Sequence, residues 1–81
     1  MLFMIVSHFE PGMPEEMEKE MAKIPREKLE QNNAGLKTIG HWVSITRQGF
    51  RVVETDDPRS IFVSTEPLRK FAKVEIIPLL P

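Results

Sequence analysis

Apolar residues occupy both the odd- and the even-numbered positions of two segments, one near each end of the chain. Residues 2 to 9 are rich in branched and aromatic side chains and stop at the turn signal Glu10-Pro11-Gly12. Residues 74 to 79 repeat the pattern, with Glu75 as their one charged residue. Strands that are apolar on both parities are covered on both faces of their sheet. The pattern therefore predicts a first and a last strand that are both buried on two sides.

After the first strand the apolar pattern changes to a helical period. Pro14 suits the first turn of a helix, and Pro25 interrupts the pattern. Apolar residues from Met13 to Ile24 recur at helical spacing and form one stripe: Met13, Met17, Met21 and Ile24. This predicts one helix that ends near Ile24. A short further helical turn through Leu29 is expected before the break at residues 31 to 35.

The middle of the chain predicts a hairpin. One strand runs from about Leu36 to Ile45, and the next from Phe50 to Thr55. Between them, Arg47-Gln48-Gly49 is typical of a three-residue loop with glycine in the left-handed position.

A second helix follows the hairpin. Asp56 or Asp57, followed by Pro58, predicts its start. The run Ser64-Thr65-Glu66-Pro67 resembles another start, so we expect a break there and a further helical segment to about Phe71.

The resulting order is β-α-β-β-α-β over one domain, residues 1–81, with no internal repeat or linker. This order and length predict an α+β, ferredoxin-like sandwich with helices on one face of a four-stranded antiparallel sheet. Right-handed crossovers place the first and third strands at the centre and the second and fourth at the edges.

Two helices cover only one sheet face, although the first and last strands are apolar on both. The uncovered face would expose a larger apolar patch than monomers usually tolerate. We therefore expect a homodimer that packs sheet against sheet through this open face. The alternative is a monomer whose outer face is made polar by Lys37, His41 and Arg51 of the second and third strands.

Charge and composition exclude several function classes. Lys and Arg number 11 and Asp and Glu 12, which gives a net charge of −1 and argues against nucleic-acid binding. The third strand also lacks the aromatic and basic pattern of RNA-recognition modules. No apolar run approaches the roughly 20 residues that span a membrane, and the apolar start at residues 1 to 6 lacks the features of a signal peptide. We expect a cytoplasmic protein that contacts neither membrane nor nucleic acid.

Candidate site chemistry concentrates on the hairpin. If Thr46 and Phe50 flank the loop, Trp42 lies opposite Glu54 and shares one face with Phe50 and Val52. The other face then carries His41, Val43, Arg51 and Val53. A slip of one residue would instead pair His41 with Glu54.

Glu54 is the candidate catalytic residue, because a carboxylate in a partly desolvated strand has a raised pKa and can act as a base. The alternative role is a hydrogen bond to backbone amides near the next helix, or an ion pair with an arginine. Trp42, with His41, Phe50 and His8, would line a site for a flat ligand, although a lone strand aromatic is more often core. There is no Cys and no close His, Asp and Glu spacing, so we expect no metal and no cofactor.

Several of these segments resemble a known group of proteins. The start Met1-Leu2-Phe3-Met4-Ile5-Val6, the run Gly40-His41-Trp42, Gly49-Phe50 and the stretch Val53 to Pro58 look like small uncharacterised proteins of the dimeric α/β-barrel superfamily. The resemblance covers the whole chain. It implies relatives among cofactor-independent monooxygenases, small isomerases and haem-binding enzymes, some of which use a His as axial haem ligand, a role that His8 could fill. The chain departs from the pattern in its second helix, which lacks a further Trp.

Three functional hypotheses follow. The first is a homodimer that holds a small apolar or aromatic molecule between sheet and helices. The second is a cofactor-independent monooxygenase- or isomerase-like enzyme with Glu54 as base. The third is a structural dimer with a filled core and no ligand. A cavity between sheet and helices favours the first two, because a filled core leaves no room for either.

Overall fold

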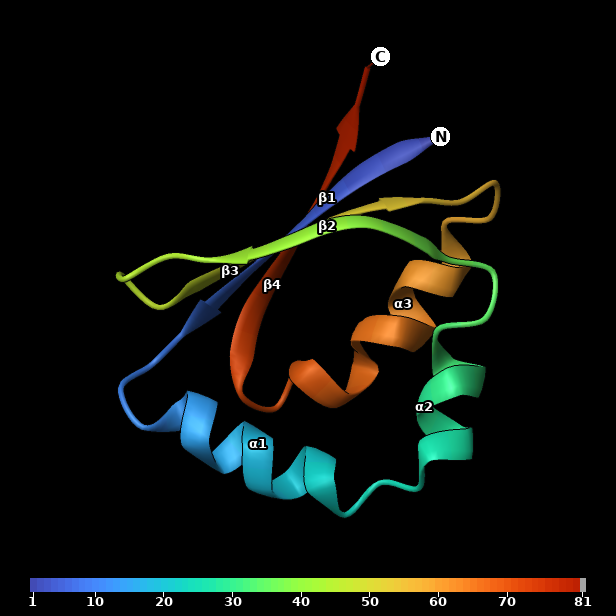
Figure 1. Ribbon diagram of the computed structural model, residues 1–81. Coiled ribbons are helices and arrows are strands. Elements are labelled where there is room, and N and C mark those ends of the chain that lie inside the picture. The colour runs from blue at the N-terminus through green and yellow to red at the C-terminus, as the bar shows by residue number, and fades with distance from the viewer. Residues whose placement is uncertain (81) are drawn as a thin grey trace.

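A computed structural model describes residues 1–80 and has a ferredoxin-like α+β fold (Figure 1). The elements in chain order are β1 (Leu2–Phe9), α1 (Met13–Ala22), α2 (Arg26–Asn32), β2 (Lys37–Val43), β3 (Gln48–Glu54), α3 (Arg59–Thr65), the 3-10 helix η1 (Glu66–Leu68) and β4 (Ala72–Leu79). The strands form one antiparallel sheet in the order β2-β3-β1-β4. The predicted fold and the central position of the first and third strands are confirmed.

The helices also follow the predicted breaks. The expected turn after Pro25 is a full helix, α2. The second predicted helix divides at Thr65, where α3 ends and η1 begins with Glu66 and Pro67. All helices lie on one side of the sheet (Figure 1). Within residues 1–80 no helix is long and apolar enough to cross a membrane.

The hydrophobic core lies between the centre of the sheet and α3. Phe3 and Ile5 of β1, Val53 of β3 and Ile61 of α3 form one buried cluster. Odd-numbered residues of β1 and β3 therefore face the helices, and even-numbered residues face away. Helix α1, by contrast, has no buried residue and lies across the sheet at a distance from this cluster (Figure 1).

The hairpin register differs from the predicted one. Trp42 pairs with Phe50, not with Glu54, and Glu54 pairs with Lys37. The reason is a loop that lies two residues earlier in the chain, because Arg47 and not Gly49 takes the left-handed conformation, with φ 62°, and the amide of Ser44 donates to the carbonyl of Gln48 over 2.8 Å.

The predicted division into faces nevertheless holds. At Trp42 and its neighbours the register is offset by four residues, an even number, so these side chains stay on the same side; a bulge between Thr38 and Gly40 changes the offset beyond that point. Trp42, Phe50, Val52 and Glu54 share one face, and His41, Val43, Arg51 and Val53 share the other. The face with His41 and Arg51 is the one that the helices cover, because Val53 packs on Ile61 there.

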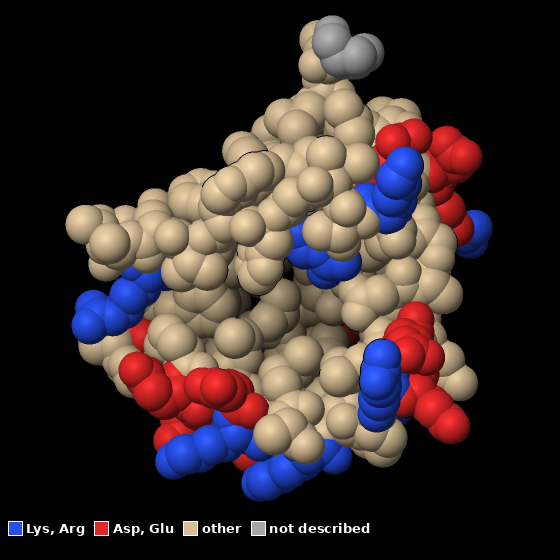
Figure 2. All heavy atoms as spheres, in the orientation of Figure 1, with Lys and Arg blue, Asp and Glu red and all other residues tan. Residues whose placement is uncertain are grey.

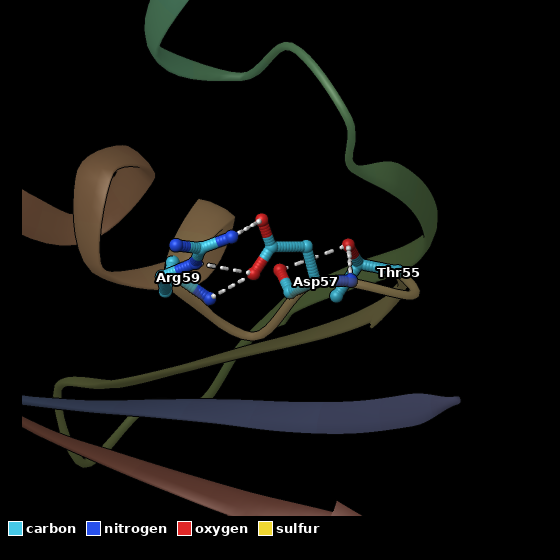
Figure 3. Close-up of polar contacts among 3 residues, drawn as sticks. All are labelled: Thr55, Asp57 and Arg59. Atoms are coloured by element: carbon cyan, nitrogen blue, oxygen red, sulfur yellow. Dashed lines mark hydrogen bonds and ion pairs between the residues drawn. The ribbon is translucent and has the colours of Figure 1, made fainter.

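The start of α3 is fixed by Asp57, as the sequence predicts. Its carboxylate accepts the backbone amide of Arg59 over 3.1 Å and the Arg59 guanidinium over 3.0 and 3.2 Å (Figure 3). These hydrogen bonds lower the pKa of Asp57. Buried Thr55 accepts the amide of Asp57 and donates to its carbonyl, which holds the turn between β3 and α3.

Candidate functional site

A cavity of about 330 Å³ separates the sheet from α1 and from the end of α3. Figure 2 shows the molecule hollowed at this place, between the sheet and the helices. The walls are mainly apolar side chains and strand backbone, and they come from β1, β2, β3, the hairpin loop, α1, α3 and η1. The lining residues are Ile5, Ser7, Phe9, Pro14, Met17, His41, Val43, Ser44, Arg47, Gly49, Arg51, Thr65 and Leu68.

The cavity exists because small residues face α1 where large ones face α3. Phe3, Ile5 and Val53 fill the space under α3, but the same sheet face continues under α1 with Ser7 and Gly49, which are paired across β1 and β3. A serine and a glycine leave space that the Met17 side chain of α1 does not fill.

The charged lining of this cavity is entirely basic. His41, Arg47 and Arg51 contribute to its walls, and the lining contains no Asp or Glu. This composition departs from that of the chain, whose net charge is −1. His41 and Arg51 are direct cross-strand partners on β2 and β3, so the sheet places two basic groups side by side.

Arg51 is held by neutral oxygens. Its Nη1 donates to Oγ of Ser64 over 3.1 Å, and its Nη2 donates to Oδ1 of Asn33 over 3.1 Å. Nε and Nη2 both donate to Oγ1 of Thr38, over 3.2 and 3.0 Å. Ser64 in turn donates to Asn33 over 2.6 Å. The network joins β2, β3, α3 and the end of α2.

No carboxylate in residues 1–80 forms an ion pair with Arg51. Burial lowers the pKa of its guanidinium, although it stays charged at neutral pH. A partly buried charge without a counter-ion is unfavourable, and an anion beside it would remove that cost. Ser7, a buried residue, adds a second polar side chain to the cavity wall.

Of the residues predicted for the site, only His41 lines this cavity. Trp42, Phe50, Glu54 and His8 lie on the opposite face of the sheet. The expectation that Glu54 is partly desolvated in a pocket between sheet and helices is wrong, because its side chain is exposed on the far face. Its role as a base has no geometric support and stays a prediction.

Trp42 is 59% exposed and does not belong to the core. Its ring lies over the backbone of Gly40, in the space that a Cβ at that position would need. Phe50 is its cross-strand neighbour. The two aromatic side chains therefore form a surface on the open face, not the wall of the cavity.

His8 lies at one end of the same open face, among polar residues. Its Nδ1 is 3.2 Å from Nε2 of Gln48, and its Nε2 is 3.6 Å from the Glu75 carboxylate. His8 and His41 are on opposite sides of the sheet, so they do not form a joint site. In residues 1–80 no group of three or more His, Asp or Glu side chains is placed to hold a metal. Haem binding stays untested.

The residue that sequence reasoning missed is Arg51. The sequence places it on the face with His41, Val43 and Val53, or on the polar outer face in the monomer alternative, but assigns it no role in the site. The available signal was its place between Phe50 and Val52, because a charged residue in mid-strand on the face shared with Val53 must find polar partners inside. The hydrogen bonds of Arg51 to Asn33 and Ser64 could not be predicted from the sequence, because only the fold brings these residues together.

A family model described as a domain of unknown function, DUF3303, matches residues 1–81. A comparison with curated proteins finds no match.

Proposed function

The chain belongs to the DUF3303 family, and from the geometry of its cavity we propose that it binds a small apolar or aromatic molecule between sheet and helices. The observation that carries this proposal is the hollow of about 330 Å³ between α1 and the sheet. Its size lies in the range of small-molecule sites, and its walls combine apolar surface with a few polar groups, as such sites do.

The structure of α1 supports this proposal. Its apolar residues are only partly buried, and none is fully removed from solvent. An apolar molecule under Met17 and Leu68 would complete the packing of the helix, because a hollow deprives its walls of contacts. The loose packing of α1 favours a binding protein over the alternative of a structural dimer with a filled core.

We further propose that a second copy of the chain covers the open sheet face. Cross-strand pairing places two rows at the middle of this face: Gly40, Val52, Met4 and Ile77, and beside them Trp42, Phe50, Val6 and Glu75. Only Glu75 in these rows is charged. The flanking row at one end holds Lys37 and Glu54 together with Leu2 and Leu79, and the row at the other end holds Gln48, His8 and Lys73, so polar or charged residues border the apolar rows at both ends. An apolar centre with a polar rim is typical of protein interfaces.

The dimensions of the face fit such a dimer. Strands of 7 or 8 residues, at about 3.3 Å per residue and about 4.8 Å between strands, give a face of roughly 500 Å². Two faces together cover roughly 1,000 Å², the smallest area expected of a specific interface. The dimer and the kinship with the dimeric α/β-barrel superfamily are proposed on this basis.

The ligand proposal is tested by filling the cavity. A Cβ at Gly49 would meet only ordinary contacts, 3.7 Å from Phe9 and from Ser7, so Gly49→Leu adds its side chain to the hollow without forcing the strand. The probe is 2-naphthamide, a flat neutral aromatic, followed through the backbone amides by heteronuclear NMR. Wild-type protein should show saturable shifts at cavity residues, and Gly49→Leu should lose them. Glu18→Leu, on the exposed side of α1, is the control and should bind as wild type.

Two outcomes would overturn the ligand proposal. One is an absence of saturable shifts at cavity residues in the wild type, with this probe and with its carboxylate analogue 2-naphthoate. The other is equal binding by wild type and a folded Gly49→Leu variant.

The dimer is tested by sedimentation at micromolar concentration. Trp42→Lys places a charge on the apolar rows and, because Trp42 is exposed, leaves the core intact. It should convert the dimer to a monomer. Ile45→Lys is the control, since Ile45 is fully exposed at the hairpin tip. A monomeric wild type, or a Trp42→Lys variant that remains dimeric, would refute the open face as the interface.

A further inference from the structure

We propose that the molecule held in the cavity is an acid: a small aromatic or aliphatic carboxylate whose charged group binds Arg51 and whose apolar body lies under α1. This inference rests on the proposed ligand-binding function and names the chemical class of the ligand. Its anchor is a basic group on the inner face of the sheet, without a counter-ion among the described residues.

The charge balance inside the cavity favours an anion. Arg51 lies on a central strand and is held only by the neutral oxygens of Thr38, Asn33 and Ser64. These hydrogen bonds fix the guanidinium in place but do not neutralise it. The nearest cross-strand neighbour is His41, which brings a second group able to donate a hydrogen bond. An acid in the cavity would supply the missing negative charge.

The network leaves part of the guanidinium available. Nη1 donates one of its two N–H groups to Ser64, and the second has no partner among residues 1–80. Arg51 contributes to the cavity wall, and in this proposal the carboxylate of the ligand accepts from this N–H group. Because Thr38, Asn33 and Ser64 already hold the side chain, little conformational entropy is lost when the anion binds.

The opposite end of the cavity suits a carbon skeleton. Phe9, Met17 and Leu68 line it with apolar atoms, and Ile5 of β1 adds apolar surface beside Arg51, its cross-strand partner. A ligand that spans both ends therefore needs a carboxylate, or an anion of similar shape, joined to a compact hydrocarbon or aromatic body. A neutral hydrocarbon would leave Arg51 uncompensated, and a highly charged ligand such as a nucleotide would place additional charge against the apolar wall.

The test uses two probes that differ almost only in charge. 2-Naphthoate and 2-naphthamide have the same aromatic body and nearly the same shape, but only naphthoate is ionised at pH 7.5. Affinities are measured by NMR titration of the wild-type protein. A charge-assisted hydrogen bond to Arg51 predicts that naphthoate binds at least about tenfold tighter than naphthamide.

Variants assign the preference to one residue. Arg51→Gln should weaken naphthoate about tenfold and leave naphthamide nearly unchanged, which removes the preference. Arg26→Gln is the matched control, because it deletes the same charge from an exposed position on α2, where Arg26 pairs with Glu30. It should retain the preference of the wild type.

A second measurement, on the wild-type protein, tests the role of Arg51 even if Arg51→Gln does not fold. The side-chain Nε–H resonance of Arg51 in the wild type should shift with naphthoate and not with naphthamide. Equal affinities for the two probes, or an Arg51 resonance that does not shift with naphthoate, would overturn the inference. Binding of both probes would still support the cavity as a ligand site. If neither probe binds, the proposed function fails as well.

Discussion

A comparison of two truncations, Ile61→Ala and Met17→Ala, separates the packed core from the cavity. Ile61 is 0% exposed and contacts Phe3, Ile5 and Val53. Removing a buried isoleucine side chain costs about 2–5 kcal/mol, because part of the vacated space remains empty. Met17 belongs to a helix without buried residues and borders a space that is already open. Its truncation should cost less than about 1 kcal/mol, since few contacts are lost and alanine favours the helix.

These free energies predict clearly different melting temperatures. For a domain of this size, 1 kcal/mol corresponds to roughly 4–8 °C, so a loss of about 3 kcal/mol at Ile61 lowers the melting temperature by roughly 12–24 °C. The Met17 variant should fall by less than about 8 °C. Total stability is only about 4–12 kcal/mol for a chain of this length, so Ile61→Val, at about 1 kcal/mol, serves as a milder second variant.

The assay is thermal and urea unfolding followed by circular dichroism, with all variants at one protein concentration, because association would raise the apparent stability. If Met17→Ala is as destabilising as Ile61→Ala, α1 is packed as tightly on the sheet as α3. The region under α1 would then be core, and the argument for a ligand cavity would fail.

Two further predictions concern the turns that frame the sheet. The Arg59 hydrogen bonds lower the pKa of Asp57 in the folded state. They therefore stabilise the fold at pH values above the pKa of Asp57 in the unfolded chain, about 3.9. This stabilisation disappears as the pH falls through the pKa of Asp57 in the folded state. Asp57→Asn should therefore lower the melting temperature relative to wild type at pH 7 but not near pH 2. A variant that still melts below wild type near pH 2 would contradict this. Gly35 and Gly12 both have left-handed backbones, with φ 82° and 85°, so alanine at either should cost about 1 kcal/mol. A Cβ at Gly35 would also lie 3.1 Å from Ser60 Oγ, whereas a Cβ at Gly12 would have no neighbour within 4 Å. Urea unfolding should therefore show a larger loss of unfolding free energy for Gly35→Ala than for Gly12→Ala. Equal losses would refute the contact with Ser60.

The fold could be predicted from the sequence because its main signals are local. Doubly apolar strands, a stripe of methionines and prolines at helix starts identify the elements, and the crossover rule fixes the strand order. The hairpin register could not be predicted in the same way. Gly49 suggested the wrong loop, because Arg47 adopts the left-handed conformation, which glycine usually takes. Hydroxyl contacts in the turn, such as Ser44 with Thr46 at 2.8 Å, help to hold it.

The position of the cavity could not be predicted from periodicity. Periodicity separates the two faces of β3 but does not say which one the helices cover. By hydrophobicity alone, Phe50 and Val52 would be placed inside, and Arg51 outside. The structure has the reverse, because Val53 and the odd-numbered residues of β1 pack on Ile61 of α3. The cavity itself depends on the small size of Gly49 and Ser7, and small residues at these positions have no periodic signal.

This arrangement of β3 connects the two proposals. A strand that turns Arg51 toward the helices and Phe50 and Val52 toward the surface is unfavourable in an isolated domain, because a charge is partly buried while apolar surface is exposed. Under the two proposals a different partner would remove each cost: an anion in the cavity for Arg51, and a second sheet for the apolar rows. Since the two partners would act on opposite faces of the same strand, an acid that orders β3 should also strengthen the dimer. The dissociation constant of the dimer should therefore fall when 2-naphthoate saturates the cavity, and a constant unaffected by the ligand would show that the two faces act independently.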